Sequence, residues 1–201
     1  FAFLVESEGR RVVYTGHFRD HGPKAAAFKQ FLATDIGALD ALITEGVQAD
    51  IDKGPAEQEV MDQAQVKAKG LRGPLFVMCA GQDVGMLTHL ALLAFKTRRF
   101  LAVDGYSALV LERVKLLAQK HGVDLKIPGL DTPFLRVLRS AATQRVYAMS
   151  EYAETFRRMR DNLYGWDWVR DNLDRLVIPV RANSELWAGE EIKDLRGATL
   201  L

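Results

Sequence analysis

The sequence predicts a doubly wound α/β fold with a mainly parallel sheet, preceded by a β-hairpin. Its 201 residues are 48% hydrophobic and 26% charged, which suits a folded chain with one sizeable core. Apolar runs rich in Val, Leu and Phe alternate with helical segments, the pattern of a parallel sheet with right-handed crossovers. The first two β-rich runs are separated only by a short turn, so we expect them to pair as a hairpin.

The predicted hairpin joins residues Phe1–Glu6 to Arg10–Thr15. Gly9, in the turn between them, can adopt the positive φ that a tight turn requires. Pro23 suits the first turn of the helix that follows. That helix is expected to turn three apolar side chains at helical spacing toward the core: Ala25, Phe28 and Leu32.

Strands and helices then alternate to the carboxyl end, and caps and breakers mark the helix ends. The expected strands are Ala38–Gly46, Pro74–Cys79, Arg99–Val103, Leu176–Val180 and Ala198–Leu201. The expected helices are Pro55–Lys69, Asp83–Lys96, Ser107–His121, Glu151–Asn162 and Glu190–Leu195. Residues 124–143 are interrupted by Pro128, Gly129 and Pro133, so loop and short helix are expected there. Three basic residues come after these breakers: Arg136, Arg139 and Arg145.

Composition narrows the class of protein. The 27 basic and 26 acidic residues give a net charge of +1, so any contact with RNA or DNA has to be local. A single cysteine, Cys79, excludes an internal disulfide and a cysteine-rich zinc site, which favours a reducing, cytoplasmic compartment. With no long apolar run and no signal-peptide pattern, the sequence predicts no membrane partner.

Both ends of the chain fall inside strand-like runs, Phe1–Glu6 and Gly197–Leu201, and the first residue is not methionine. The unpaired amides and carbonyls of a strand need partners. We therefore expect the chain to be an internal piece of a larger fold. It would pair with the missing remainder of the same protein or with another copy in a homo-oligomer.

Polar residues and glycines follow the predicted strands. In open α/β sheets, ligands bind beyond the carboxyl ends of the strands, where helix amino termini point their amides. The segments that follow strands are Gly16-His17, Glu45-Gly46, Cys79–Asp83 and Asp104–Tyr106. The sequence therefore predicts a site at this edge.

Each of these residues also has a structural interpretation. Asp83 stands where a helix N-cap is required, and Cys79 suits a small core position. Glu45, a carboxylate that ends an apolar strand, must meet a partner, a metal ion or solvent. His17 and His21 could ligate zinc, manganese or iron. The alternative is a hydrogen-bonded turn that merely carries two histidines.

The order of these motifs resembles that of the metallo-β-lactamase-fold hydrolases with a β-CASP insertion, the group that includes the ribonuclease J type. Thr15–Gly22 and Thr44–Val47 stand where one branch has Ser-Gly-Asp-Phe-Arg-Ala-His-Gly and Met-Glu-Gly-Thr. Cys79–Asp83 and Asp104–Ala108 stand where it has Cys-Ser-Ser-Gln-Asn and Asp-Leu-Tyr-Thr-Ala. The likeness spans nearly the whole chain.

The resemblance implies three regions: a partial metallo-β-lactamase segment (1–46), a β-CASP-like α/β domain (47–181), and a return toward the lactamase domain (182–201). It implies hydrolysis of RNA or DNA phosphodiesters by a water activated by zinc or manganese. The implied residues are Glu45 and Asp104 as catalytic groups, Gln82, Asp83 and Tyr106 as substrate-binding groups, and His17 and His21 as metal ligands.

Three positions depart from the family pattern. His17 replaces an aspartate that bridges two ions, and a neutral imidazole lacks the charge and second oxygen for that role. Gly85 and Met86 replace an aspartate and an arginine. These departures favour the alternative of a non-catalytic β-CASP-type binding or scaffold protein.

In the resembled family, most metal ligands would lie outside these 201 residues, so we expect the fragment alone to be inactive.

A third interpretation of the sequence is an unrelated nucleotide-binding α/β domain that uses the loop at Gly81. It is disfavoured because the chain has no Gly-x-Gly-x-x-Gly or P-loop pattern.

Overall fold

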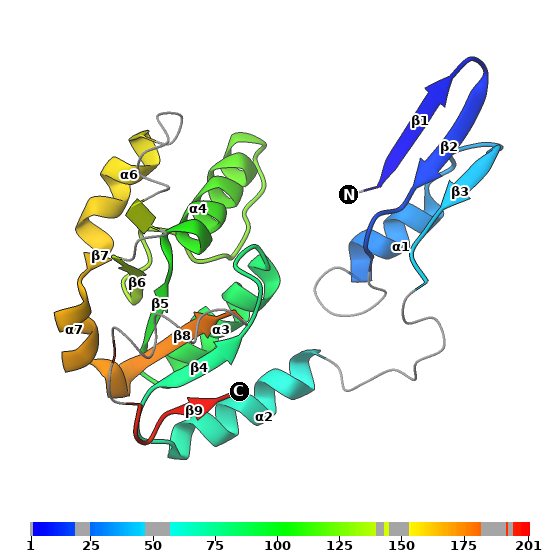
Figure 1. Ribbon diagram of the computed structural model, residues 1–201. Helices are drawn as coiled ribbons and strands as arrows, with labels where there is room; N and C mark the ends of the chain where they lie inside the picture. The colour runs from blue at the N-terminus through cyan, green and yellow to red at the C-terminus, as the bar shows by residue number, and fades with distance from the viewer. Residues whose placement is uncertain are drawn as a thin grey trace. The chain divides into compact units, whose positions relative to one another are not determined.

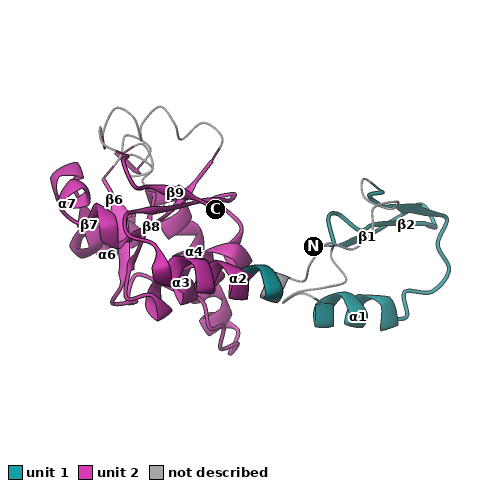
Figure 2. Cartoon of the chain, turned by 90° about the horizontal axis from the view of Figure 1, so that it is seen from below, with its two compact units in different colours: residues 1–60 teal, residues 61–201 magenta. Residues whose placement is uncertain are grey.

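The computed structural model describes residues 2–18, 25–46, 57–139, 143–144, 153–181, 192 and 195–201. The contacts of the chain divide it into two units, residues 1–60 (unit 1) and 61–201 (unit 2), coloured separately in Figure 2. No helix within the described ranges is long and apolar enough to cross a membrane.

Unit 1 is built on a three-stranded sheet in the order β1-β2-β3 (Figure 1). β1 (Phe3–Ser7) and β2 (Arg10–Tyr14) are antiparallel, and β3 (Ala41–Ile43) lies parallel to β2. Glu8 and Gly9 both have positive φ, 49° and 73°, the conformation of the two-residue turns that match strand twist. The predicted hairpin is confirmed. The strand predicted at residues 38–46 is shorter in the structure, where it runs only from Ala41 to Ile43.

Helix α1 (Ala25–Ala33) of unit 1 buries none of its residues. Leu32 is 67% exposed, so the prediction of a core face on this helix is wrong. Helical spacing shows which side chains share a face, but it does not show whether another layer covers them. Phe28 alone makes an aromatic contact, stacking on Phe18 with ring centroids 4.9 Å apart.

Unit 2 contains a six-stranded sheet whose pairings are all parallel, in the order β7-β6-β5-β8-β4-β9. The strands are β4 (Leu75–Met78), β5 (Phe100–Val103), β6 (Leu135–Leu138), β7 (Leu163–Tyr164), β8 (Leu176–Val180) and β9 (Thr199–Leu200). The predicted parallel sheet is confirmed.

Helices cover both faces of this sheet. Alternate strand residues such as Leu75, Leu101 and Val137 pack in one buried cluster with the helices of the first face. Those helices are α2 (Glu57–Gly70), α3 (Val84–Lys96), α4 (Gly105–Lys120) and α6 (Ala153–Met159). The intervening residues, Phe76 and Ile178 among them, pack on the other face with α7 (Trp166–Asp171). This alternation shows the doubly wound arrangement.

Strand β6 lies where the sequence predicted loop and short helix, so that prediction is wrong for Leu135–Leu138. Arg136 interrupts its apolar pattern. The guanidinium carbon of Arg136 lies 4.3 Å from the ring centroid of Phe100 and 4.9 Å from that of Tyr164, which accommodates the charge on an aromatic surface. The predicted helix at residues 151–162 is present as α6, and its last turn is the 3-10 turn η3 (Arg160–Asn162). Further unpredicted elements are β7, α7 and the 3-10 turn η4 (Leu173–Arg175). Arg145 and most of the predicted helix at 190–195 lie outside the described residues.

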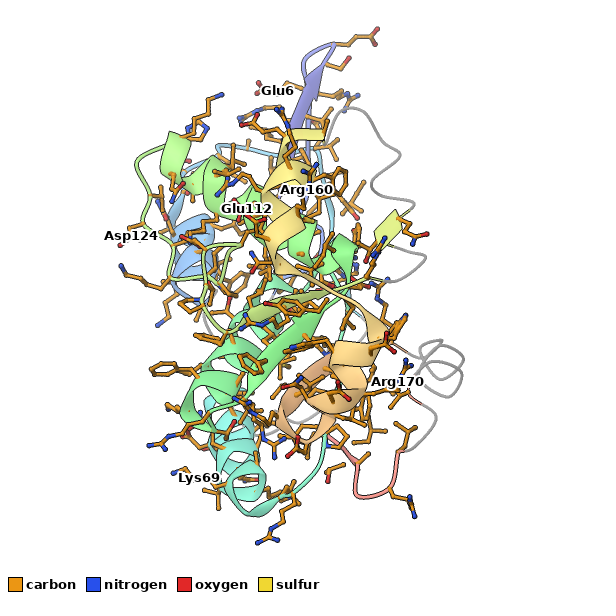
Figure 3. The ribbon with its side chains drawn as sticks, turned by 90° about the vertical axis from the view of Figure 1, so that its left-hand side faces the viewer. Glu6, Lys69, Glu112, Asp124, Arg160 and Arg170 are labelled. Carbon is orange, nitrogen blue, oxygen red and sulfur yellow. The ribbon has the colours of Figure 1, made fainter. Side chains whose placement is uncertain are left out.

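Two buried charged side chains fix loops of unit 2. Arg99, 8% exposed, donates hydrogen bonds of 2.7–2.8 Å to the carbonyls of Leu71, Gly73 and Asp174. Glu112, 1% exposed, lies where α4 passes α6 (Figure 3). It pairs with Arg158 at 2.6 Å and accepts a hydrogen bond from the Leu130 amide. Each charge is thus compensated where it is buried.

Candidate functional site

The carboxyl ends of β2 and β3 bring two distant segments of unit 1 side by side. The strands are paired in parallel up to Tyr14 and Ile43. Beyond them, the amide of Thr15 donates to the Ile43 carbonyl at 3.0 Å, and the Thr15 and Thr44 hydroxyls are 3.1 Å apart. The next residues of the two segments, from Gly16 and from Glu45, are therefore held next to each other.

Glu45 uses its two carboxylate oxygens separately. Oε2 lies 2.5 Å from Nδ1 of His17, and Oε1 accepts a hydrogen bond of 3.0 Å from the Phe18 amide. The Glu45 side chain is 29% exposed, whereas that of His17 is 93% exposed. The structure thus brings together two of the predicted site residues, 28 positions apart. His21, predicted as a second metal ligand, lies outside the described residues.

The donor chemistry of this pair suits one zinc or manganese ion, but the number of donors is too small for a centre. No group of three or more His, Cys, Asp or Glu side chains that could hold a metal ion occurs in the described part of the chain. Catalytic zinc sites have three protein ligands. Because Nδ1 of His17 is engaged by Glu45, only Nε2 of this imidazole remains to ligate a metal ion. One imidazole nitrogen does not fit the bridging role of a carboxylate between two ions.

In unit 2, the order of the strands reverses at β8. The chain passes from β4 over to β5, β6 and β7, and β8 then returns between β5 and β4. Such a reversal is the point where open α/β sheets bind ligands, beyond the carboxyl ends of the strands. For this sheet, the relevant residues are those that follow β4, β5 and β8.

Pro179 separates β8 from β5 at this edge. The amide of Cys79 donates to the Val180 carbonyl at 2.9 Å, so the backbone groups of Val180 face β4 and those of Pro179 face β5. The ladder between β5 and β8 ends at Leu101 and Val177. Proline, which has no N–H, is tolerated in this central strand because no ladder continues there.

Asp104 and Arg181 pair across that separation. One oxygen of Asp104 caps α4 by accepting a hydrogen bond of 2.7 Å from the Ser107 amide, and the other binds the Arg181 guanidinium. A side chain at Gly81 would place Cβ 2.8 Å from the Ser107 hydroxyl and 2.9 Å from Nη2 of Arg181. A larger residue at position 81 would therefore displace the Ser107 hydroxyl and the end of the Arg181 side chain. Asp104, predicted as catalytic, is a cap and an ion-pair partner.

The predicted substrate-binding residues occupy the same edge in different roles. Tyr106 donates a hydrogen bond of 3.1 Å to the Gln82 side chain, and its ring centroid lies 5.6 Å from the Arg181 guanidinium carbon. Asp83 accepts a hydrogen bond of 3.0 Å from the Met86 amide, which confirms its interpretation as the N-cap of α3. Gln82, Tyr106 and Arg181 therefore form the polar surface of the site.

Cys79 lies in the same loop and is partly buried. Burial, followed by the negative charge of Asp83, raises the pKa of the Cys79 thiol to about 11, although Arg181 opposes the shift. The group is thus a thiol and not a thiolate near neutral pH. This agrees with the interpretation of Cys79 as a packing residue and not as a nucleophile.

Sequence reasoning missed Arg181 and Ser107. The signal for Arg181 was present, because it directly follows the apolar strand Leu176–Val180, as Glu45 follows the strand at residues 41–43. Ser107, 3% exposed, became relevant only through its approach to Gly81 across the sheet edge. A search for polar residues directly after every predicted strand would have found Arg181 but not Ser107.

A hollow of about 370 Å³ lies at the opposite, amino edge of the sheet. Its lining is Gly73, Pro74, Arg170, Leu173, Asp174, Ile192 and Arg196. These residues precede β4, β8 and β9, whereas the polar residues described above follow strands. Arg170 marks this region in Figure 3. We assign the candidate site of unit 2 to the carboxyl edge, where the strand order reverses and two helices begin.

Comparison with known proteins adds no relative: no protein-family model matches the chain, and no curated protein matches it.

Proposed function

We propose that the chain is part of a metal-dependent hydrolase that cleaves the phosphodiesters of RNA or DNA, with a metallo-β-lactamase-type segment and a β-CASP-like α/β domain. The observation that carries the proposal is the contact between His17 and Glu45. In the resemblance, both motifs follow strands, and the parallel pairing of β2 with β3 brings them together although they are far apart in the sequence.

The carboxyl edge of unit 2 supports a polyanionic substrate. Arg181 places a guanidinium there, and α3 and α4 begin at the same edge. A guanidinium recognises phosphate through charge-assisted hydrogen bonds, and helix amino termini favour negative charge. In this proposal Arg181 exchanges Asp104 for a substrate phosphate, while Tyr106 and Gln82 line the strand path.

A bound zinc or manganese ion would supply an activated water for the attack on phosphorus. Of the described residues, His17 would hold that ion, and the remaining ligands would come from residues outside the described ranges. Glu45 stays in contact with His17, and the Phe18 amide holds Glu45 in place.

The second candidate is a non-catalytic β-CASP-type binding or scaffold protein. It is favoured by the imidazole of His17, which stands where the family pattern has a carboxylate that bridges two ions. Both candidates predict binding at Arg181, but only the hydrolase predicts metal and turnover. Metal content and turnover, measured on one preparation, therefore separate them.

The experiment uses the intact gene product that contains these residues, with elemental analysis for zinc and manganese and hydrolysis of single-stranded RNA. The hydrolase predicts bound metal and turnover that His17→Ala abolishes, while the matched control His121→Ala, on an exposed histidine of unit 2, changes neither. Arg181→Met should raise KM with little change in kcat. If the parent lacks metal and turnover, and His17→Asp restores metal, the non-catalytic candidate is correct.

A further inference from the structure

The loop that follows β4 leaves a small space over Gly81. A Cβ at this position would lie 2.8 Å from the Ser107 hydroxyl and 2.9 Å from Nη2 of Arg181. Gly81 is not one of the glycines with positive φ, so its backbone conformation is open to other residues as well. What the missing side chain provides here is space, next to two groups that can donate hydrogen bonds.

The hydroxyl of Ser107 is buried without a hydrogen-bond partner among the described residues. Ser107 stands in the first turn of α4 and is 3% exposed; its amide donates to Asp104, but its hydroxyl makes no bond within the described ranges. The hydroxyl oxygen keeps some contact with solvent, because the fully shielded side-chain atoms without a partner belong to Gln65 and Arg136. A buried hydroxyl in this state has a hydrogen bond to give to a ligand.

The second group beside this space is the guanidinium of Arg181. Its Nη2 carries two N–H groups, so it can bind Asp104 with one and a further acceptor with the other. A guanidinium only donates hydrogen bonds, whereas a hydroxyl can donate or accept. Any atom that Ser107 and Arg181 share must therefore be an acceptor. Two donors that converge on one position are the arrangement that binds a negatively charged oxygen.

The charges at this edge determine which kind of oxygen fits. Arg181 brings one positive charge, while Asp104 and Asp83 are carboxylates that cap α4 and α3. The two carboxylates repel a dianion more strongly than a group with a single negative charge. We infer that Ser107 and Arg181 together bind one phosphate oxygen of a phosphodiester over Gly81. The inference rests on the proposed function for the substrate class, a nucleic-acid strand, and adds Ser107 and Gly81 to the phosphate site of Arg181.

Removal of the hydroxyl tests the first donor. The probe is a short oligouridylate with hydroxyl groups at both ends, titrated by calorimetry into the intact gene product. Ser107→Ala should weaken binding by about 10-fold, the effect of one hydrogen bond to a charged group. Thr88→Ala is the matched control, because that hydroxyl already bonds to the Val84 carbonyl within α3 at 2.7 Å. Equal affinity of the parent and a folded Ser107→Ala variant would overturn the inference.

The salt dependence of binding separates a direct contact from a general loss of structure. A neutral hydroxyl displaces no counterion, so Ser107→Ala should lower the affinity and leave the slope of log affinity against log salt unchanged. Arg181→Met should reduce that slope by about 0.7–1, because one phosphate contact with a cation is lost. A changed slope in Ser107→Ala would mean that the substitution acts by displacing Arg181, which contradicts a direct contact of the hydroxyl.

Gly81→Ala tests the space itself. The added methyl group occupies the position on which the two donors converge, so we expect it to weaken oligouridylate binding by about 10-fold or more. Gly85→Ala is the matched control in the same region, because its Cβ would meet only an oxygen of Asp83, at 3.4 Å. Parent affinity in a folded Gly81→Ala variant would overturn the inference. Should one of the two variants fail to fold, the other still decides.

Titration with inorganic phosphate distinguishes a phosphodiester from a free phosphate group. We expect it to bind more weakly than the oligouridylate, because it is largely a dianion at about pH 8. If inorganic phosphate binds through Ser107 and the oligouridylate does not, the assignment to a phosphodiester is wrong. If neither probe binds, the whole inference fails.

Hydrolysis is not part of these readouts. A protein that binds the strand through Ser107 but does not cleave it would refute the proposed hydrolase and leave this inference standing. Cleavage of RNA by a protein whose binding is unaffected by Ser107→Ala would do the reverse.

Discussion

The two units differ in how they bury their apolar side chains. Unit 2 collects apolar residues from both faces of its sheet in two buried clusters. Among the described residues of unit 1, only Val13 and Thr15 are buried. Its sheet leaves six large apolar side chains more than 40% exposed: Phe3, Leu4, Val5, Tyr14, Leu42 and Ile43. The units thus have comparable strand patterns and very different interiors.

This difference shows that pattern and stability are separate properties of a sequence. The turn at Gly9 and the β-rich runs are sufficient to define the hydrogen-bond ladder of unit 1. A stable sheet also needs a second layer, and three short strands with one unburied helix provide little of it. The interior of unit 2, in contrast, is closed by helices on both faces.

The largest expected effect is at Arg99 in unit 2. Arg99→Met removes the donor for three backbone carbonyls at the amino edge of the sheet, and we expect it to lower the free energy of unfolding by about 4 kcal/mol. Urea unfolding followed by tryptophan fluorescence reports on unit 2 alone, since Trp166, Trp168 and Trp187 all lie within it. Arg72→Met, on an exposed neighbour, should change stability by less than about 0.5 kcal/mol. Equal effects of the two variants would contradict the role of Arg99.

A pair of leucine truncations compares the interiors directly. Leu101→Ala in β5, where the side chain is 0% exposed, should cost about 3 kcal/mol of unit 2 stability in the same assay. Leu42→Ala in β3, where it is 59% exposed, should leave unit 2 unchanged and alter the amide exchange of unit 1 only slightly. A large loss of stability from Leu42→Ala would show that this face of unit 1 is covered in solution.

The single thiol offers a smaller test of the closed interior. Because the pKa of Cys79 is raised to about 11, its thiolate fraction at about pH 8 is about 240-fold lower than that of a free cysteine with a pKa of about 8.5. Modification by a disulfide reagent should be slower by about 100-fold or more than in the urea-unfolded chain. Comparable rates in the folded and unfolded chain would mean that the loop after β4 opens readily.

The smallest effect concerns an exposed carboxylate of unit 1. The hydrogen bond from the Arg11 amide, with a second from the Arg10 side chain, lowers the pKa of Asp40 below 3.8. A lowered pKa in the folded state means that the contribution of Asp40 is present above the unfolded value and is lost as the pH falls through the folded value. A ¹³C titration should show this, with Asp131 as a comparison in unit 2, whose pKa the Lys115 hydrogen bond lowers. Titration of Asp40 at or above 3.8 would show that the Arg11 contact does not persist in solution.

The sequence predicted the central strands of unit 2 well, and the reason is burial. β4, β5 and β8 are covered on both faces, so they appear as continuous apolar runs. β6 was missed because Arg136 interrupts the pattern, and its aromatic surroundings come from Phe100 and Tyr164, which are distant in the sequence. Local pattern cannot show contacts of that kind.

The candidate site was predictable in its residues but not in its contacts. His17, Glu45, Gln82 and Asp104 were each marked by their position after a strand. That Glu45 would bind His17 depends on the parallel pairing of β2 with β3, which brings together strands separated by a helix. The pairing of Asp104 with Arg181 depends in the same way on β8 returning between β5 and β4.

The late return of β8 also determines when the sheet can form during synthesis. β4 has β8 and β9 as its two neighbours, and β5 needs β8 on one side. A nascent chain that has not yet reached residues 176–180 therefore carries β4 with both edges unpaired, although most of unit 2 has been made. Unpaired edges of apolar strands invite aggregation, and closing such distant pairings is slow. The nascent chain is therefore most exposed to aggregation just before its last strands emerge.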